Sequence, residues 1–227
     1  MSILVFLHEM LPNDTRIEIE NIVAGIILEG RTDHCATIRN SLCNRYETSR
    51  VVKAAFESNA IIKKEQAGLI EAYCDKHSFW FKNLPGEDRY LTRGGESKVY
   101  LANDDKHVVK LNDAVYYATW LEYINSILLH NILFTNTSYR LLGFVKQDNT
   151  LFAVVEQMFI VADALAELDD IKKFLEFNEF ANIRRNDYAN KRLGLILEDM
   201  HDENVLVSSE TLFFIDSVFY TVAPEKT

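Results

Sequence analysis

The stretch Asp199-Met200-His201-Asp202-Glu203-Asn204, followed twelve positions later by Asp216, decides the fold of this chain. Between Asn204 and Asp216 run two short apolar segments, 205–207 and 212–215, which a polar segment separates. Apolar segments joined by a short polar turn predict a β-hairpin. Because a hairpin returns the chain to its starting point, we expect Asn204 and Asp216 to meet at its open end.

An amide and a carboxylate at one end of a hairpin, with a second carboxylate nearby, fit a magnesium nucleotide. Mg²⁺ takes hard oxygen ligands, here those of Asn204 and Asp216, while Asp199 can orient an attacking hydroxyl. The alternative is a solvated loop, since Asp and Asn are common at turns. The spacing alone leaves both open, and the rest of the chain has to decide.

The composition is that of an ordinary folded protein with one sizeable core, or one domain with a small appendage. The chain has 227 residues, 48% of them hydrophobic, with only 8 Gly and 3 Pro. Its formal net charge of −10 argues against a nucleic-acid partner, because phosphate backbones require clustered Lys and Arg. The basic pairs at 63–64 and 184–185 are best explained as solvated faces.

The cysteines and the apolar segments indicate in which cellular compartment the protein is expected. Cys35, Cys43 and Cys74 are odd in number and lack the C-x-x-C spacing, so we expect neither a disulfide framework nor a zinc knuckle. The N-terminus has no basic region before its apolar residues and is a poor signal peptide. The apolar run 22–28 is too short to span a bilayer. We therefore expect a soluble, cytoplasmic protein without a membrane partner.

The sequence pattern changes near Pro85-Gly86, from mainly helical before it to strands after it. Residues 1–87 are predicted to be an α-helical N-terminal region. A helix over 14–28 would be capped by Asp14 and ended by Gly30. Further helices are expected over 35–46, 48–58 and 63–77.

Residues 88–227 are predicted to be a separate α+β part with two lobes, 88–157 and 158–227. In the first lobe, Gly-rich and Asn/Asp-rich turns separate short apolar runs, which predicts a five-stranded antiparallel sheet with one helix across it. The expected strands are 89–93, 97–101, 107–111, 139–146 and 151–157, and the expected helix is 114–133. A short helix over 169–177 would lead to the decisive stretch. No long flexible linker separates these parts.

A glycine turn is the first of the remaining candidate features. Gly94, Gly95 and Ser97 lie between two predicted strands, where glycines allow a positive φ and let backbone N–H groups approach phosphate oxygens. A plain β-turn is the alternative.

Lys110 and Glu122 form a candidate ion pair. Lys110 lies in an apolar strand, where an ammonium group needs a partner unless it reaches the sheet edge. Glu122 is the only acid between positions 114 and 140, on a mostly apolar helix. We favour a buried pair, while an exposed helix edge for Glu122 stays open.

The segment around Glu156 and Met158 follows the last strand of the predicted sheet. An apolar strand that runs into a connector suits a hinge whose backbone groups bind adenine. Its side chains can equally be part of the core.

The order of these parts resembles the protein-kinase-like superfamily over residues 88–220. Within it, the stretches 94–100, 108–112, 197–207 and 214–216 resemble the small Ser/Thr/Tyr kinase domain of polyvalent proteins from phages and mobile elements. The resemblance implies a minimal two-lobed kinase fold with a reduced second lobe. It also implies ATP and Mg²⁺, and transfer of a phosphate to a hydroxyl of a protein or small molecule.

Carried over by position, the resemblance makes Lys110 the contact to the α/β-phosphates and Glu122 its ion-pair partner. Asp199 would be the base or orienting carboxylate, and Asn204 and Asp216 would hold magnesium. The turn and the hinge would contact the nucleotide through Gly94, Gly95, Ser97, Glu156 and Met158.

The chain departs from the family pattern in several places. Ser97 stands where the third glycine of the turn is expected, and Leu197-Glu198 where many kinases have His-Arg. Only eleven residues follow Asp216, too few for an activation segment. We therefore expect residues 1–85 to cover the hairpin in place of the missing helices. A pseudokinase or nucleotide sensor, and an interaction module without nucleotide binding, are the alternative functions.

Overall fold

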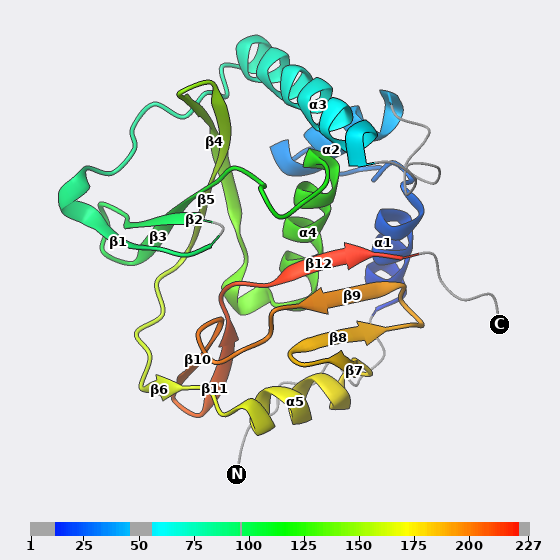
Figure 1. Cartoon of the computed structure of the whole chain (residues 1–227), viewed down its shortest axis with the longest axis vertical. Helices are drawn as coiled ribbons and strands as arrows, with labels where there is room; N and C mark the ends of the chain where they lie inside the picture. The colour runs from blue at the N-terminus through cyan, green and yellow to red at the C-terminus, as the bar shows by residue number, and fades with distance from the viewer. Residues whose placement is uncertain (1–11, 46–55, 96, 223–227) are drawn as a thin grey trace. The chain divides into compact units, whose positions relative to one another are not determined.

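The computed structural model in Figure 1 describes residues 12–45, 56–95 and 97–222. These residues form an α+β structure, as the sequence predicts, and contain five α-helices. The chain divides into two compact units. The first contains the described residues within 1–28, 125–137 and 160–227, and the second those within 29–124 and 138–159.

The second unit contains the predicted five-stranded antiparallel sheet, in the order β1-β2-β3-β5-β4. The strands are β1 (Tyr90–Arg93), β2 (Ser97–Leu101), β3 (His107–Asn112), β4 (Arg140–Gln147) and β5 (Thr150–Met158). A 3₁₀ turn, η2 (Glu87–Arg89), precedes β1. Each neighbouring pair is antiparallel, so this part of the predicted fold is confirmed.

One face of this sheet carries an apolar core. It is built from Tyr100, Ala102, Val109, Leu111, Val145 and Val154, with Phe81 and Leu84 packed against it. The turn between β2 and β3 is held by Asp104, whose carboxylate accepts N–H bonds from Lys106 and His107. These bonds and the His107 side chain lower the pKa of Asp104 to about 2.

Three helices contribute to the second unit: α2 (His34–Arg45), α3 (Phe56–His77) and the start of α4 (Trp120–Leu133). The predicted helix over 48–58 falls largely outside the described residues. The predicted helix start at 114 is wrong by six residues. Asn112 and Asp113 accept N–H bonds from Ala114 and Val115, which forms Asx turns rather than helix caps.

The first unit begins with α1 (Asn13–Ala24), which is shorter than the sequence predicts. The helix ends at Gly25, with φ 71° in the left-handed region, and not at Gly30. Gly25 provides the left-handed C-cap that commonly ends helices. The predicted cap at Asp14 is also wrong, because the N-cap position is Pro12.

The predicted hairpin is present in the first unit. Strands β10 (Val205–Ser208) and β11 (Thr211–Phe214) pair antiparallel, and β6 (Ala164–Leu165) extends them to three strands. The hairpin core packs through Phe214, whose ring stacks on Phe134 at 4.3 Å between centroids and lies 5.1 Å from Phe174. Phe134 precedes η3 (Thr135–Thr137), and Phe174 lies in α5 (Leu168–Phe177).

A second, four-stranded sheet in the first unit was not predicted. Its order is β12-β9-β8-β7, visible in Figure 1, with β7 (Ala181–Arg184), β8 (Asp187–Asn190), β9 (Leu195–Glu198) and β12 (Val218–Thr221). Its strands have four residues each, and the segment 181–192 is rich in charge and Asn, so it gives no apolar alternation. The expectation that residues 1–85 cover the hairpin stays a prediction.

Two further findings concern the described residues. Cys35, Cys43 and Cys74 are free and buried. Burial raises the pKa of the Cys35 thiol to about 12, and does the same for Cys74. Over 12–45, 56–95 and 97–222, none of the helices has the length and apolar character needed to span a membrane.

Candidate functional site

The hairpin brings Asn204 and Asp216 together, as its sequence predicts. Val205 pairs with Phe214, so the residues just outside this pair stand at the open end. There the backbone carbonyl of Asn204 accepts N–H bonds from Ile215 at 3.0 Å and from Asp216 at 3.4 Å. Backbone hydrogen bonds therefore bring Asn204 and Asp216 next to each other, although they are twelve positions apart in sequence.

Asp199 is bonded directly to Asn204. The Asn204 Nδ2 donates to the backbone carbonyl of Asp199 at 2.9 Å and to its Oδ2 at 3.2 Å. Asp199 has φ 64°, in the left-handed region that Asp and Asn tolerate best among non-glycine residues. We call Asp199, Asn204 and Asp216 the hairpin cluster.

His201 is a member of this loop that the sequence analysis did not single out. Its Nδ1 accepts the Glu203 N–H at 3.2 Å, and its Nε2 lies 3.2 Å from the Asn204 Nδ2. That Nε2 lies 3.4 Å from Asp199 Oδ1. The sequence could have identified His201, because a histidine two residues after Asp199 in a short loop has to lie close to it.

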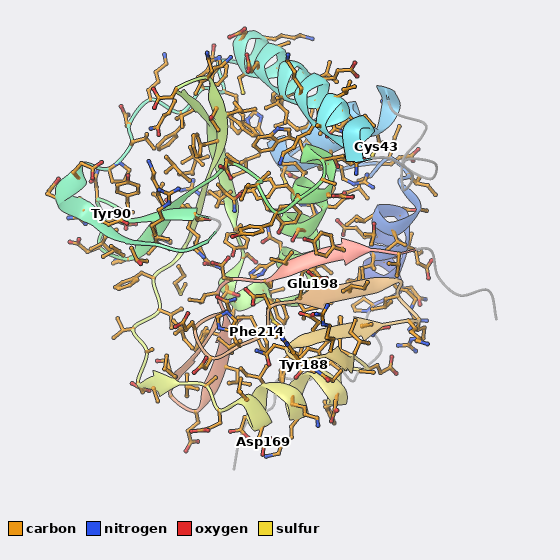
Figure 2. All side chains as sticks on the ribbon, in the orientation of Figure 1. Cys43, Tyr90, Asp169, Tyr188, Glu198 and Phe214 are labelled. Atoms are coloured by element: carbon orange, nitrogen blue, oxygen red, sulfur yellow. The ribbon has the colours of Figure 1, made fainter. Side chains whose placement is uncertain are left out.

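Acidic residues surround Asp199. Asp187, at the start of β8, accepts the Asp199 N–H on its Oδ1 at 3.2 Å. Glu198, labelled on β9 in Figure 2, precedes Asp199 in the chain. Burial, followed by the charges of Asp187 and Asp199, raises the pKa of Glu198. The neighbourhood therefore disfavours further negative charge and is suited to a cation.

The chain just after Asp216 is fixed by buried polar bonds to α4. His130 Nδ1 lies 2.6 Å from Ser217 Oγ, and His130 Nε2 lies 2.9 Å from the carbonyl of Thr137. Because a carbonyl only accepts, Nε2 carries the proton and Nδ1 accepts from the Ser217 hydroxyl. The Phe219 N–H donates to Ser126 Oγ at 2.9 Å. These bonds fix the position of the backbone next to Asp216.

In the second unit, Lys110 is buried within the sheet, with 5% of its surface exposed. It stands opposite Val99 on β2 and Val155 on β5, so these three side chains share one face. Its Nζ lies 5.4 Å from the centroid of the Tyr139 ring, a cation–π distance. The predicted burial of this lysine is confirmed.

Glu122 lies in the first turn of α4, where it helps to cap the helix. Its Oε2 accepts the Ala118 N–H at 2.9 Å, and its own N–H donates to Thr119 Oγ1 at 3.1 Å. This is a reciprocal capping arrangement, which fixes the start of the helix. The pairing of Glu122 with Lys110 stays a prediction.

The glycine turn forms between β1 and β2. Neither Gly94 nor Gly95 has φ in the left-handed region, so the turn does not use the positive φ that glycine allows. A Cβ on residue 95 would stand 2.9 Å from the hydroxyl of Tyr116, an exposed side chain that can move aside. Ser97 is buried and its Oγ accepts the Asn112 Nδ2 at 3.1 Å.

The predicted hinge corresponds to the end of β5. Glu156 accepts hydrogen bonds from the Arg140 guanidinium at 2.9 and 2.5 Å, so its side chain is engaged within the sheet. Met158 is 52% exposed, and the N–H of the following Phe159 donates to the Lys106 carbonyl. We call Lys110, Glu122, the glycine turn and this strand end the sheet cluster.

The hairpin cluster fits a magnesium ion that a nucleotide brings with it. Among the described residues, no group of three or more His, Cys, Asp or Glu side chains could hold a metal unaided. Mg²⁺ is typically bound through one or two carboxylates together with phosphates and waters. Asp216 supplies a carboxylate. Asn204 uses its Nδ2 for the bonds to Asp199, so its amide oxygen points away from Asp199.

Fold and site together define a kinase-like protein: a buried strand lysine on an antiparallel sheet, and an acid–amide–acid cluster on a hairpin. A family model described as "Serine/Threonine/Tyrosine Kinase found in polyvalent proteins" matches residues 63–223. The match covers more than half of the chain, which therefore belongs to this family. The resemblance seen in the sequence is thus confirmed. A search of curated proteins gave no match.

Proposed function

We propose that this protein is an ATP- and Mg²⁺-dependent phosphotransferase. It would transfer the γ-phosphoryl group of ATP to a hydroxyl of a protein or small-molecule acceptor. The bond between the γ-phosphorus and the β–γ bridging oxygen breaks, a bond to the acceptor oxygen forms, and ADP leaves. The family, whose model names a Ser/Thr/Tyr kinase, supports this reaction class.

Each cluster has a role in the proposed reaction. Asp199 orients the acceptor hydroxyl and takes its proton, which a carboxylate on a short loop can do without covalent chemistry. Lys110 neutralises charge on the α- and β-phosphates. Glu122 pairs with Lys110 and holds its ammonium group in place. The backbone at Met158 and at the glycine turn would bind adenine and phosphate.

Magnesium would be held by Asn204 and Asp216, where it would neutralise negative charge on the phosphates. Burial is the main cause of the raised pKa of Glu198, and the negative charges of Asp187 and Asp199 add to it, which supports a cation there. The free, buried cysteines agree with the cytoplasmic location expected from the sequence.

One observation carries the proposal: the Asn204 amide bonds to Asp199 while its backbone carbonyl accepts the Asp216 N–H. Three residues spread over eighteen positions of sequence are thereby held together in one loop. A solvated turn has no need for such a network, whereas phosphoryl transfer relies on fixed positions.

The direct test is calorimetric titration of ATP into the wild-type protein, with and without Mg²⁺. We expect binding that requires Mg²⁺, followed by transfer of ³²P from γ-labelled ATP to an acceptor pool. No heat at millimolar ATP in either condition would contradict the proposal. Magnesium-dependent binding with no transfer to any acceptor would favour the second candidate below.

The second candidate is a pseudokinase or nucleotide sensor. The glycine turn favours it, because Ser97 occupies the third glycine position and its hydroxyl is used by Asn112. Gly95 is also covered by Tyr116, so this turn presents less open backbone than a glycine-rich phosphate loop. ATP binding that is independent of Asp199 and gives no turnover would identify this function.

A further inference from the structure

Helix α3 supplies a buried acceptor to the start of α4. Gln66 on α3 is 1% exposed, and its Oε1 accepts the Leu121 N–H at 3.1 Å. Leu121 is the second residue of α4, where the first N–H groups lack partners within the helix. The bond links residues 55 positions apart and supplements the caps from Thr119 and Glu122.

A second side chain of α3 holds the turn that leads into α4. Lys63 Nζ donates to the carbonyls of Ala114 at 2.5 Å and Tyr117 at 3.0 Å. Ala114 has φ 56°, so this turn contains a strained residue that needs outside support. Lys63 and Gln66 are three positions apart on α3 and therefore lie on one face of it.

The charge of Lys63 also acts on Glu122. Burial lowers the pKa of Lys63, while the nearby carboxylates of Asp113 and Glu122 raise it. The ammonium group therefore sits among two carbonyls and two carboxylates at the start of the helix. Loss of this group would leave the carbonyls of Ala114 and Tyr117 without their donor and remove an attraction on Glu122.

We propose that Lys63 and Gln66 are positioning residues, an anchor within the chain that fixes Glu122 for its role beside Lys110. The inference rests on the proposed phosphotransferase function. The extent of the family gives independent support. Its model begins at Lys63, well before the glycine turn, and so includes the anchor. The match thus takes in α3 from Lys63 to its end at His77.

The anchor is tested by amide hydrogen exchange of the full chain over residues 114–124, read by mass spectrometry. Lys63→Met and Gln66→Leu remove the polar contacts with little change in volume. We expect exchange there to rise about 5- to 30-fold, the effect of losing one or two such bonds, with α5 unchanged. Lys63→Arg and Gln66→Glu keep a donor and an acceptor and should restore slow exchange. The matched control is Lys64→Met, on the exposed side of α3.

Kinetics separate positioning from a purely structural role. With Glu122 misplaced, Lys110 loses the partner that holds it at the α- and β-phosphates, so we expect KM for ATP to rise about tenfold while kcat changes little. Exchange and KM equal to those of Lys64→Met, in an active enzyme, would overturn the anchor alone. A wild-type protein that neither binds nor turns over Mg-ATP would overturn the proposed function, and the catalytic purpose of the anchor with it.

Discussion

The hairpin cluster and the sheet cluster are built in different ways. In the hairpin cluster, Asp199 and Asn204 bond to each other, and the Asn204 backbone bonds to Asp216. In the sheet cluster, the polar side chains have partners within the sheet or its helix: Glu156 with Arg140, Ser97 with Asn112, Glu122 with Ala118. One cluster is self-contained, and the other is a set of separately supported positions.

This difference shows what a short sequence span can determine. The hairpin cluster lies within eighteen positions, and one hairpin register fixes all its backbone distances. The sheet cluster spreads from Gly94 to Met158, so its geometry depends on strand order, helix start and packing of α3. Rigid positions in a self-contained loop should carry the chemistry, and the dispersed positions should carry nucleotide affinity.

Asp199→Asn tests the strongest form of this comparison. We expect transfer to fall by about 10²- to 10⁴-fold, because Asn cannot take the proton of the acceptor hydroxyl. Asn tolerates the φ of 64° and can still accept the Asn204 bond, so nucleotide binding and stability should stay near wild type. The measurement is kcat beside the ATP Kd. Asp202→Asn removes a neighbouring charge as the control, and wild-type turnover in Asp199→Asn would remove the catalytic role.

Asp216→Ala tests whether the same cluster holds magnesium. We expect the Mg²⁺-dependent part of ATP binding to weaken about 100-fold, since even indirect partners of metals contribute 10- to 100-fold. Calorimetry at fixed ATP and varied Mg²⁺ measures this. Glu210→Ala removes the same charge at the opposite end of the hairpin and should leave the Mg²⁺ dependence intact. Equal effects of the two variants would assign the loss to net charge.

Much of the fold follows from local sequence patterns. The five-stranded sheet was predicted almost to the residue, because Gly94-Gly95 and the Asn/Asp turn at 103–105 mark its strand ends. The hairpin was predicted from the apolar runs on either side of Ser208-Ser209-Glu210. Except for the β3–β5 pair, the paired strands are neighbours in sequence, so turn chemistry and alternation are sufficient.

The sheet β12-β9-β8-β7 could not be predicted because its strands have only four residues each, and β7 and β8 carry charged and amide side chains. β12 also pairs with a strand twenty residues earlier in sequence, so its register depends on tertiary packing. The start of α4 was missed because Asn112 and Asp113 suit both a helix cap and an Asx turn. His201 and Asp187 were missed because their partners appear only once the loop closes.

Lys110→Met tests the sheet cluster and should give a smaller effect than the two changes in the hairpin cluster. Met keeps the length of the buried side chain but removes its charge, so the sheet should stay folded. We expect the ATP Kd to rise about 10- to 100-fold, as for loss of one charged hydrogen bond. Lys98→Met, one strand away, is the control. If Lys110→Met lowered only kcat, the proposed division of roles between the clusters would be wrong.

Glu198→Gln should give the smallest effect and tests the electrostatics around Asp199. The raised pKa means that the native state binds this proton more tightly than the unfolded chain does. Ionised Glu198 therefore opposes folding at neutral pH, and this cost disappears as pH falls through the raised folded-state pKa toward the ordinary glutamate pKa of 4.5. Because the side chain is partly exposed, solvent screening keeps the gain small.

We expect Glu198→Gln to raise Tm by about 1–2 °C at pH 7, with the difference vanishing near pH 4. Glu210→Gln, at an exposed turn, serves as control. An equal gain at both pH values would show that packing, and not the negative charge of Asp187 and Asp199, sets the stability of this loop.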